Sequence, residues 1–222
     1  MMPSSPIRAV TLDVGGTLVH AWPSVGHVYA EAASRQGFQF SPEELDRRFS
    51  AAWRAKTDFS HTESGWSVLV DLVFAGLVET PPSRSFFPAL YAAFSAPSAW
   101  RVYDDVLPCL EKLRRRGFKL GAISNWDDRL RPLLEQLGLA KWFDVIVISA
   151  EFGQAKPHPA IFQHAARLLG TDPSAILHVG DHRVQDFEAA RNAGYQALLL
   201  RRGEPPRAGE RISSLAEAFS VL

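Results

Sequence analysis

The chain has 222 residues, a length that buries a sizeable core and suits one large domain or one domain with an insert. Lys plus Arg and Asp plus Glu both number 24, so no overall charge favours nucleic acid or an anionic membrane as a partner. A single cysteine, Cys109, excludes a disulfide framework within the chain and fits a reducing compartment.

Nothing in the sequence predicts a membrane or secreted protein. No stretch approaches the roughly 18 consecutive apolar residues of a transmembrane helix. The first ten residues, MMPSSPIRAV, lack the apolar centre of a signal peptide. We therefore expect a cytoplasmic protein that binds neither membrane nor nucleic acid; its oligomeric state does not follow from the sequence.

Short β-rich apolar runs alternate with helical patterns along most of the chain. The expected strands are 7–12, 118–123, 143–148, 176–179 and 195–200. The expected helices are 111–116, 129–137, 159–169 and 184–192. This alternation predicts a parallel sheet with helices on both faces. Residues 201–211, rich in Arg, Gly and Pro, predict a surface loop before a short terminal helix at 213–219.

The stretch between the first and second expected strands departs from that alternation, because it contains helical patterns only. These are 25–36, 42–56, 65–75 and 84–94. Ser41 followed by Pro42 is typical of a helix start, since a hydroxyl N-cap and a proline in the first turn both favour it. We expect residues 1–20 and 101–222 to form an α/β core domain and residues 21–100 to form a helical insert.

Residues suited to binding phosphate follow the first two expected strands directly. Asp13 and Thr17 stand in a glycine-containing turn after the first strand. Ser124 and Asn125 stand where the second strand passes into a helix, and backbone N–H groups at a helix start bind phosphate oxygens. Ligands of open α/β sheets bind beside the carboxyl ends of the strands. We therefore expect these side chains to line one site.

Charged residues at the later strand ends extend this site. Lys156 precedes the expected helix at 159–169, and Asp181 and Asp186 follow the strand at 176–179. A parallel sheet would bring them beside Asp13, where three carboxylates would repel one another unless a cation shared them. Carboxylate oxygens without a histidine or cysteine partner suit Mg²⁺.

The motifs LDxxGT, ISN, KPHP and HVGDxxxxD, in this order, resemble those of the haloacid dehalogenase superfamily, and the resemblance spans the whole chain. It implies an α/β fold with a Rossmann-like parallel sheet and an all-helical cap inserted after the first strand. It also implies that Asp13 is a nucleophile that forms an aspartyl-phosphate. Thr17, Ser124 and Asn125 would then contact the phosphate, and Lys156 would clamp it.

The resemblance further implies a Mg²⁺ cofactor held by side chains and by the backbone. Asp13 and Asp181 would be direct ligands, and Asp186 would bind directly or through water. The backbone carbonyl of residue 15 would complete the protein's share, which Gly15 can still supply. The implied activity is a hydrolase of the phosphatase type that acts on a small phosphorylated metabolite.

Gly15 is the one departure from the D-x-D-x-T pattern of such phosphatases. The aspartate usual at this position protonates the leaving group and then activates water, and general acid–base help is typically worth ~10²–10⁴-fold. We therefore expect an impaired or specialised phosphatase, faster on aryl or acyl phosphates than on sugar phosphates. His20 and His182 lie near enough in the sequence to be considered as substitute proton relays.

Three other functions fit parts of the pattern. A binding protein that senses a phosphorylated ligand or docks a partner would explain Gly15 without catalysis. A dehalogenase also lacks the second aspartate, but it does not use Mg²⁺, whereas Asp181 and Asp186 argue for a metal. A phosphonate hydrolase pairs a small residue at position 15 with a cap lysine that forms a Schiff base, and Lys56 is the only lysine of the insert.

Overall fold

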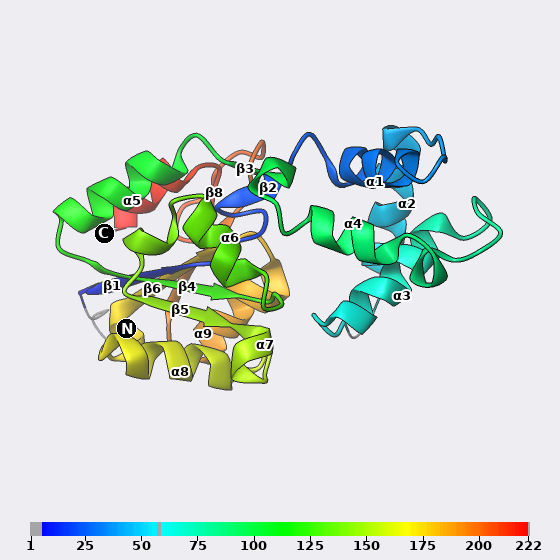
Figure 1. The fold of residues 1–222 in the computed structure, drawn as a ribbon. Coiled ribbons are helices and arrows are strands. Elements are labelled where there is room, and N and C mark those ends of the chain that lie inside the picture. The colour runs from blue at the N-terminus through cyan, green and yellow to red at the C-terminus, as the bar shows by residue number, and fades with distance from the viewer. Residues whose placement is uncertain (1–5, 57–58, 222) are drawn as a thin grey trace. The chain divides into compact units, whose positions relative to one another are not determined.

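The computed structural model describes residues 6–56 and 59–221, and the chain divides into two compact units (Figure 1). Met1–Val19 and Val102–Leu222 form the core unit, and His20–Arg101 form the insert unit. Residues 1–5, which belong to the stretch considered for a signal peptide, lie outside the described residues.

The core unit is built on a sheet in which every paired strand is parallel to its neighbour. In spatial order the strands are β5 (Val145–Ile148), β4 (Lys119–Ser124), β1 (Ala9–Leu12), β6 (Ile176–Gly180), β7 (Gln196–Leu200) and β8 (Arg211–Ile212). At the end of β1, Leu12 pairs with Ala122 of β4 on one side and with Val179 of β6 on the other. The strand order therefore reverses at β1, which is where open α/β sheets bind ligands.

Helices cover both faces of this sheet, as the alternating pattern predicts. They are α5 (Val106–Arg115), α6 (Leu130–Gln136), α7 (Ser149–Phe152), α8 (Pro159–Leu169) and α9 (Ala189–Asn192). Shorter turns are η3 (Ala140–Trp142), η4 (Pro173–Ala175), η5 (Arg183–Glu188) and η6 (Leu215–Val221). Figure 1 shows α8 and α9 on one side of the sheet and α5 and α6 on the other. Phe162 of α8 is fully buried in the apolar core beneath β4 and β6.

The predicted α/β class is confirmed, and the differences lie at the edges of the core unit. The stretch expected to be a surface loop, 201–211, ends at Arg211, where β8 begins and pairs in parallel with β7 at the edge of the sheet. The helix expected at 184–192 begins as the π-helical segment η5 and becomes α-helical only at Ala189. Asp186 lies within η5, and its carboxylate accepts a hydrogen bond from the His182 N–H at 2.9 Å.

The insert unit is helical, with α1 (Val25–Ser34), α2 (Pro42–Ala55), α3 (Glu63–Phe74), α4 (Phe87–Ala93), η1 (Pro82–Arg84) and η2 (Pro97–Ala99). The chain enters and leaves it along a two-stranded sheet of β2 (Val19–Ala21) and β3 (Trp100–Val102), which the sequence patterns do not predict. Ser41 caps α2 as expected, because its side chain accepts from the Glu44 N–H. The helix expected at 84–94 starts only at Phe87, since η1 occupies the preceding turn.

The insert unit has a core of its own, rich in aromatic rings. Tyr29 of α1 and Phe74 of α3 are buried with their ring centroids 5.9 Å apart, and Phe86 meets Phe74 edge to face at 5.3 Å. In the part of the chain that the structure describes, no helix is both long enough and apolar enough to span a lipid bilayer.

Asp105 joins three separate segments of the core unit. Its carboxylate accepts two hydrogen bonds from the Arg202 guanidinium, each 2.9 Å, and one from the Leu215 N–H at 2.8 Å. Arg202 also donates to the carbonyl of Thr17 at 2.9 Å. The carboxylate thus ties the start of α5 and the C-terminal segment to the loop that follows β1.

We predict that Asp105→Ala lowers the free energy of unfolding by about 2 kcal/mol, because it removes charge-assisted hydrogen bonds and leaves Arg202 without its anion. Urea unfolding followed by circular dichroism measures the change. Asp104→Ala is the matched control, since Asp104 is exposed, and it should stay within about 0.5 kcal/mol of the wild type. Equal effects of the two substitutions would contradict the assigned role of Asp105.

Candidate active site

Asp13 lies at the carboxyl end of the central strand, where β4 and β6 flank it. Its N–H donates to the Val179 carbonyl at 2.9 Å, which continues the β1–β6 pairing one residue beyond the strand. Because β1 lies between β4 and β6, residues at the ends of all three strands meet there. Ser124 ends β4 and Asp181 follows β6, so both reach the surroundings of Asp13.

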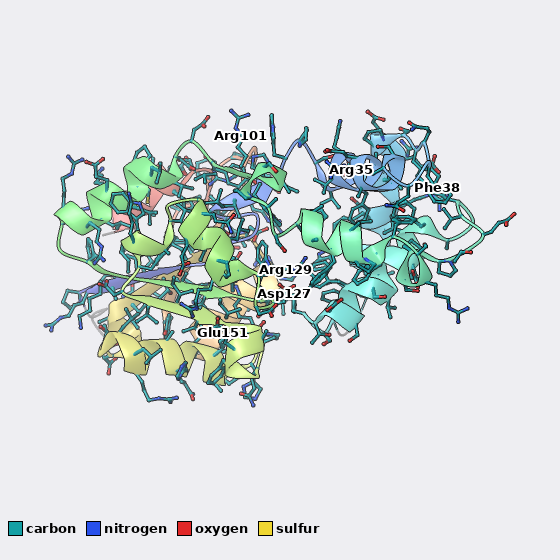
Figure 2. All side chains as sticks on the ribbon, viewed as in Figure 1. Arg35, Phe38, Arg101, Asp127, Arg129 and Glu151 are labelled. Atoms are coloured by element: carbon teal, nitrogen blue, oxygen red, sulfur yellow. The ribbon has the colours of Figure 1, made fainter. Side chains whose placement is uncertain are left out.

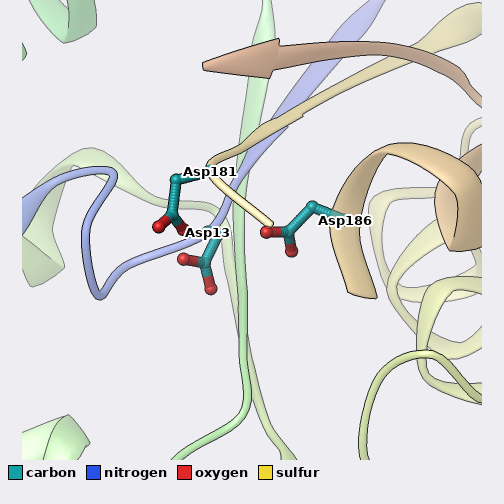
Figure 3. Close-up of side chains that lie close together, drawn as sticks. All are labelled: Asp13, Asp181 and Asp186. Atoms are coloured by element: carbon teal, nitrogen blue, oxygen red, sulfur yellow. The ribbon is translucent and has the colours of Figure 1, made fainter. Parts of the chain in front are cut away.

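The carboxylates of Asp13, Asp181 and Asp186 converge as the sequence predicts (Figure 3). One oxygen from each lies within 4.8 Å of the others. Two glycines make this closeness possible. A Cβ on Gly16, whose φ is +78°, would lie 2.5 Å from Asp181 Oδ2, and a Cβ on Gly180 would lie 2.3 Å from Asp186 Cγ. Any side chain at either position would push a carboxylate away from the cluster.

Lys156 lies between two of these carboxylates. Its Nζ donates to Asp13 Oδ1 at 2.7 Å and to Asp186 Oδ1, and the lysine is only 3% exposed. Burial alone would lower the pKa of this ammonium, but the charges of Asp13 and Asp186 raise it above its usual value. Lys156 is therefore a permanent cation, as the predicted clamp requires.

The three carboxyl groups differ in how well this cation compensates them. Burial raises the pKa of Asp13 more than the Lys156 ammonium lowers it. For Asp186 the balance is opposite, because Lys156 and His178 outweigh burial and hold its pKa well below the usual range. Burial, together with the charges of Asp13 and Asp186, raises the pKa of Asp181 to about 7. Three carboxylates thus face one ammonium, and negative charge remains in excess.

This donor set fits a hard divalent cation. All the clustered side-chain ligands are carboxylate oxygens, which Mg²⁺ prefers over nitrogen or sulfur donors. The charges of Asp13 and Asp186 contribute, after burial, to the raised pKa of Asp181. A cation beside Asp181 would offset those charges. Asp13, Asp181 and Asp186 are the side chains able to hold such an ion among the residues described.

The predicted phosphate ligands are positioned differently from one another. Ser124 Oγ donates a long hydrogen bond of 3.4 Å to Asp13 Oδ1. Thr17 is fully buried, and its hydroxyl has no hydrogen-bond partner within the described chain. Asn125 uses its side chain on the backbone of Lys156, accepting from N–H at 2.7 Å and donating to the carbonyl at 2.8 Å. The Asn125 amide therefore helps to position Lys156. The sequence-based prediction gave Asn125 a contact with phosphate and did not include this role.

The helix expected at 129–137 is α6, which begins at Leu130, and a loop from Asn125 to Arg129 separates it from β4. An ion pair within the loop stabilises it (Figure 2). Arg129 Nη2 lies 2.6 Å from Asp127 Oδ2, and both side chains are mostly buried. Ser124 ends β4 and Asn125 lies in this loop, so, contrary to the sequence-based prediction, the first turn of α6 does not include either residue.

Two residues of the site carry roles that were not predicted. His178, fully buried in β6, shares a 2.9 Å hydrogen bond with Thr11 Oγ1 and lies 3.4 Å from Asp186 Oδ1. In the sequence, His178 is a polar residue within the apolar run 176–179, and this position could have indicated that it bonds to a buried polar group. Trp126 packs against Gly15, and the only hint of it is an aromatic residue directly after the ISN motif.

The histidines considered as proton relays are otherwise engaged. His182 caps η5, where its ring accepts from the Gln185 N–H at 3.1 Å. His20 belongs to the insert unit and contacts the Ala21 carbonyl at 3.1 Å.

Lys56, at the end of α2, lies with its Nζ 2.8 Å from the centroid of the Trp53 ring and 4.4 Å from that of Phe59. It lines a cavity of about 650 Å³ between α2 and α3 of the insert unit, beside the aliphatic side chains of Val68 and Leu72. Partial burial lowers the pKa of Lys56 to about 8. A substantial fraction of this amine is therefore neutral, and nucleophilic, near physiological pH.

We predict that Lys156→Met lowers the free energy of unfolding by about 3–5 kcal/mol in buffer with EDTA, because two buried carboxylates lose their shared cation. Adding Mg²⁺ should restore part of the loss, since a second cation would then offset the same charges. Thermal and urea unfolding with and without Mg²⁺ measure this. Lys141→Met, at an exposed position, should change stability by less than about 0.5 kcal/mol. A Lys156→Met protein as stable as this control would contradict the assigned electrostatics.

Comparison with known proteins identifies the family. The profile of the haloacid dehalogenase-like hydrolases matches residues 7–194. The human haloacid dehalogenase-like hydrolase domain-containing protein 3 is 35% identical over 205 residues, 87% of this chain and 82% of that protein. The glyceraldehyde 3-phosphate phosphatase of Methanopyrus kandleri is 36% identical over 215 residues, 89% of this chain and 85% of that enzyme. The magnesium-bound HAD-hydrolase YfnB of Bacillus subtilis superposes with a TM-score of 0.82 at 16% identity, covering 98% of this chain and 99% of that one. The chain belongs to the haloacid dehalogenase-like hydrolase family.

Proposed function

We propose that this chain hydrolyses the phosphate ester of a small metabolite through a covalent phosphoryl group on Asp13. The observation that carries the proposal is the Lys156 ammonium, 2.7 Å from Asp13 Oδ1 and bonded also to Asp186. It holds the carboxylate in place and supplies positive charge where a phosphoryl group would gather negative charge. The 36% identity to a glyceraldehyde 3-phosphate phosphatase supports a phosphate ester as the substrate class.

The reaction follows in two displacements. An Asp13 oxygen attacks phosphorus, and the bond from phosphorus to the ester oxygen breaks with its electron pair leaving on that oxygen. Water then attacks the phosphorus of the aspartyl-phosphate, the bond to Asp13 breaks, and the carboxylate is regenerated as phosphate and a proton are released. Thr17 and Ser124 offer hydroxyl groups to phosphate oxygens, and the unpartnered hydroxyl of Thr17 supports that role.

Magnesium is the cofactor that this proposal includes. Asp13, Asp181 and Asp186 would hold it, together with the backbone carbonyl of Gly15. When bound, Mg²⁺ offsets the charge of the phosphoryl oxygens and aligns them for displacement. Asn125 keeps Lys156 in place through the backbone of that residue, so that the ammonium meets Asp13 whether or not substrate is present.

The other functions differ from this proposal in one observable each. A non-catalytic phospholigand sensor would bind phosphate and phosphate esters without turnover, and calorimetry combined with a rate assay would recognise it. A dehalogenase would release halide from a 2-haloacid without Mg²⁺. A phosphonate hydrolase would use the Lys56 amine on a carbonyl group, and the lowered pKa of that amine is the observation in its favour.

We predict that Asp13→Asn lowers kcat on phosphate monoesters by about a thousandfold or more, because the amide cannot accept the phosphoryl group. EDTA should abolish the wild-type rate and Mg²⁺ should restore it. Release of inorganic phosphate from a panel of phosphorylated metabolites measures both. Asp128→Asn, which changes an exposed carboxylate four residues beyond Ser124, should keep the wild-type rate. Equal rates of the wild type and Asp13→Asn would exclude Asp13 as the nucleophile.

We also predict that Lys56 is the most readily acylated lysine of the chain at pH 8. About half of an amine with a pKa near 8 is neutral at that pH, against well under 1% of an ordinary lysine, so labelling should be about tenfold faster or more. The difference should shrink toward pH 10, where other lysines also lose their protons. Peptide mass spectrometry after brief acylation measures it, with exposed Lys141 as the reference.

If the chain were a phosphonate hydrolase, Lys56 would also react with substrate, and a trapping experiment would detect this. Borohydride would then trap an aldehyde phosphonate on Lys56, and Lys56→Ala would lose activity. We expect no trapping, and Lys56→Ala should hydrolyse phosphate esters at the wild-type rate within about threefold.

A further inference from the structure

The indole ring of Trp126 lies against Gly15, close to the position that a Cβ at this residue would take. A Cβ built on Gly15 would lie 3.2 Å from Trp126 Cζ3, 3.9 Å from Cε3 and 4.0 Å from Cη2. The first of these distances is shorter than ordinary van der Waals contact between carbon atoms. Gly16 has a positive φ, but Gly15 does not, so backbone conformation does not require glycine at position 15. The obstacle to a side chain there is the nearby Trp126 ring.

The chain around Trp126 is fixed by hydrogen bonds on both sides. The Trp126 N–H donates to Ser149 Oγ at 3.0 Å, and the same hydroxyl donates to the Trp126 carbonyl at 3.1 Å. The Ala150 N–H donates to that carbonyl at 3.2 Å. Asn125, the residue before, is tied to the backbone of Lys156. These hydrogen bonds hold the backbone of Trp126 and of the preceding residue in place beside Gly15.

The contact between this ring and Gly15 lies beside the reacting carboxylate. Gly15 comes two residues after Asp13, and Trp126 comes two residues after Ser124, whose hydroxyl bonds to Asp13. Lys156 and Asp181 come from the segments after β5 and β6, and Asp186 comes from η5. The loop after β4 thus adds an aromatic ring to a site whose other named side chains are charged or polar.

We propose that Trp126 determines substrate specificity, and that it selects phosphate esters of aromatic alcohols. This inference rests on the proposed function. The departing aryl group would lie against the indole, where aromatic rings attract one another beyond simple burial. A phenol with a pKa of about 10 leaves as a stable anion, and so needs less help from an acid than an alkyl alcohol, whose pKa is nearer that of water, about 15.7. The ring and the missing acid therefore favour the same leaving group.

The same geometry makes Gly15 and Trp126 a matched pair. In Gly15→Asp alone, the new Cβ would be crowded by the indole, so the single variant should give little gain on alkyl phosphates. Gly15→Asp combined with Trp126→Ala gives the carboxylate room, and this double variant should hydrolyse ethyl phosphate at least about tenfold faster than either single variant. If the effect of the double variant on the ethyl phosphate rate equals the product of the two single effects, the two residues do not act as a pair and this inference is wrong.

The decisive comparison uses phenyl phosphate and ethyl phosphate at saturating Mg²⁺. We expect Trp126→Ala to lower kcat/KM for phenyl phosphate by about fivefold and to leave ethyl phosphate unchanged within about twofold. Trp126→Phe, which keeps an aromatic surface, should retain most of the preference, whereas Trp126→Leu should lose it. A uniform loss on both esters, or no change on either, would show that Trp126 only fills space.

A binding measurement separates this inference from the proposed function. Phenylphosphonate, methylphosphonate and inorganic phosphate are titrated calorimetrically into wild type and Trp126→Ala with Mg²⁺ present. We expect the wild type to bind phenylphosphonate about fivefold more tightly than methylphosphonate, and Trp126→Ala to bind both equally. If the wild type shows no such preference, the inference about Trp126 fails while the phosphate site stands. If none of the three anions binds and no ester is hydrolysed, the proposed function itself fails.

Discussion

The Lys156 ammonium lies between the carboxylates of Asp13 and Asp186, and all three groups are buried. Taking these charges out of water costs several kcal/mol per ion, and their mutual attraction offsets that cost only when the geometry is close to ideal. Much of the surrounding chain serves this geometry. Asn125 holds the Lys156 backbone, and His178 and the His182 N–H contact Asp186. Burial, together with the excess of negative over positive charge in this arrangement, raises the pKa of Asp181, and a divalent cation would offset that excess.

The requirement for close charges explains why the sequence around the site is so restricted. Asp186 can approach Lys156 only because Gly180 has no side chain, and Asp181 can approach the loop after β1 only because Gly16 has none. The π-helical segment η5 serves the same end, since it turns Asp186 back toward the end of β6. Strand order supplies the remainder. With β1 between β4 and β6, three loops that are more than 50 residues apart in the sequence meet around one carboxylate.

The features that could be predicted from the sequence are those with a local cause. Apolar runs such as 118–123 and 176–179 become strands of one sheet, and a hydroxyl followed by proline at Ser41 begins a helix. The convergence of Asp13, Asp181 and Asp186 was also predictable, because the carboxyl ends of parallel strands share one edge. What could not be predicted depends on partners far along the chain. β8 forms because it pairs with β7, and the Asn125 side chain hydrogen-bonds to the backbone of Lys156. The contact of Trp126 with Gly15 joins residues more than 100 positions apart.

In the proposed phosphoryl transfer, the charges around Asp13 and the residue at position 15 would serve different steps. Charges stabilise the phosphoryl group as it moves, whereas an acid or base moves a proton to the leaving group or from water. This chain has charged groups suited to the first task, with Lys156 bonded to Asp13, whereas position 15 has a glycine next to the Trp126 ring and no acid. In the first displacement, a leaving group of low basicity removes the need for a proton. In the second, the group expelled is the Asp13 carboxylate, which is itself a weak base, so the remaining difficulty is the proton of the attacking water. Under the proposed function, we expect such a site to favour esters whose leaving groups depart without a proton, and we expect the slow step to follow transfer of the phosphoryl group to Asp13.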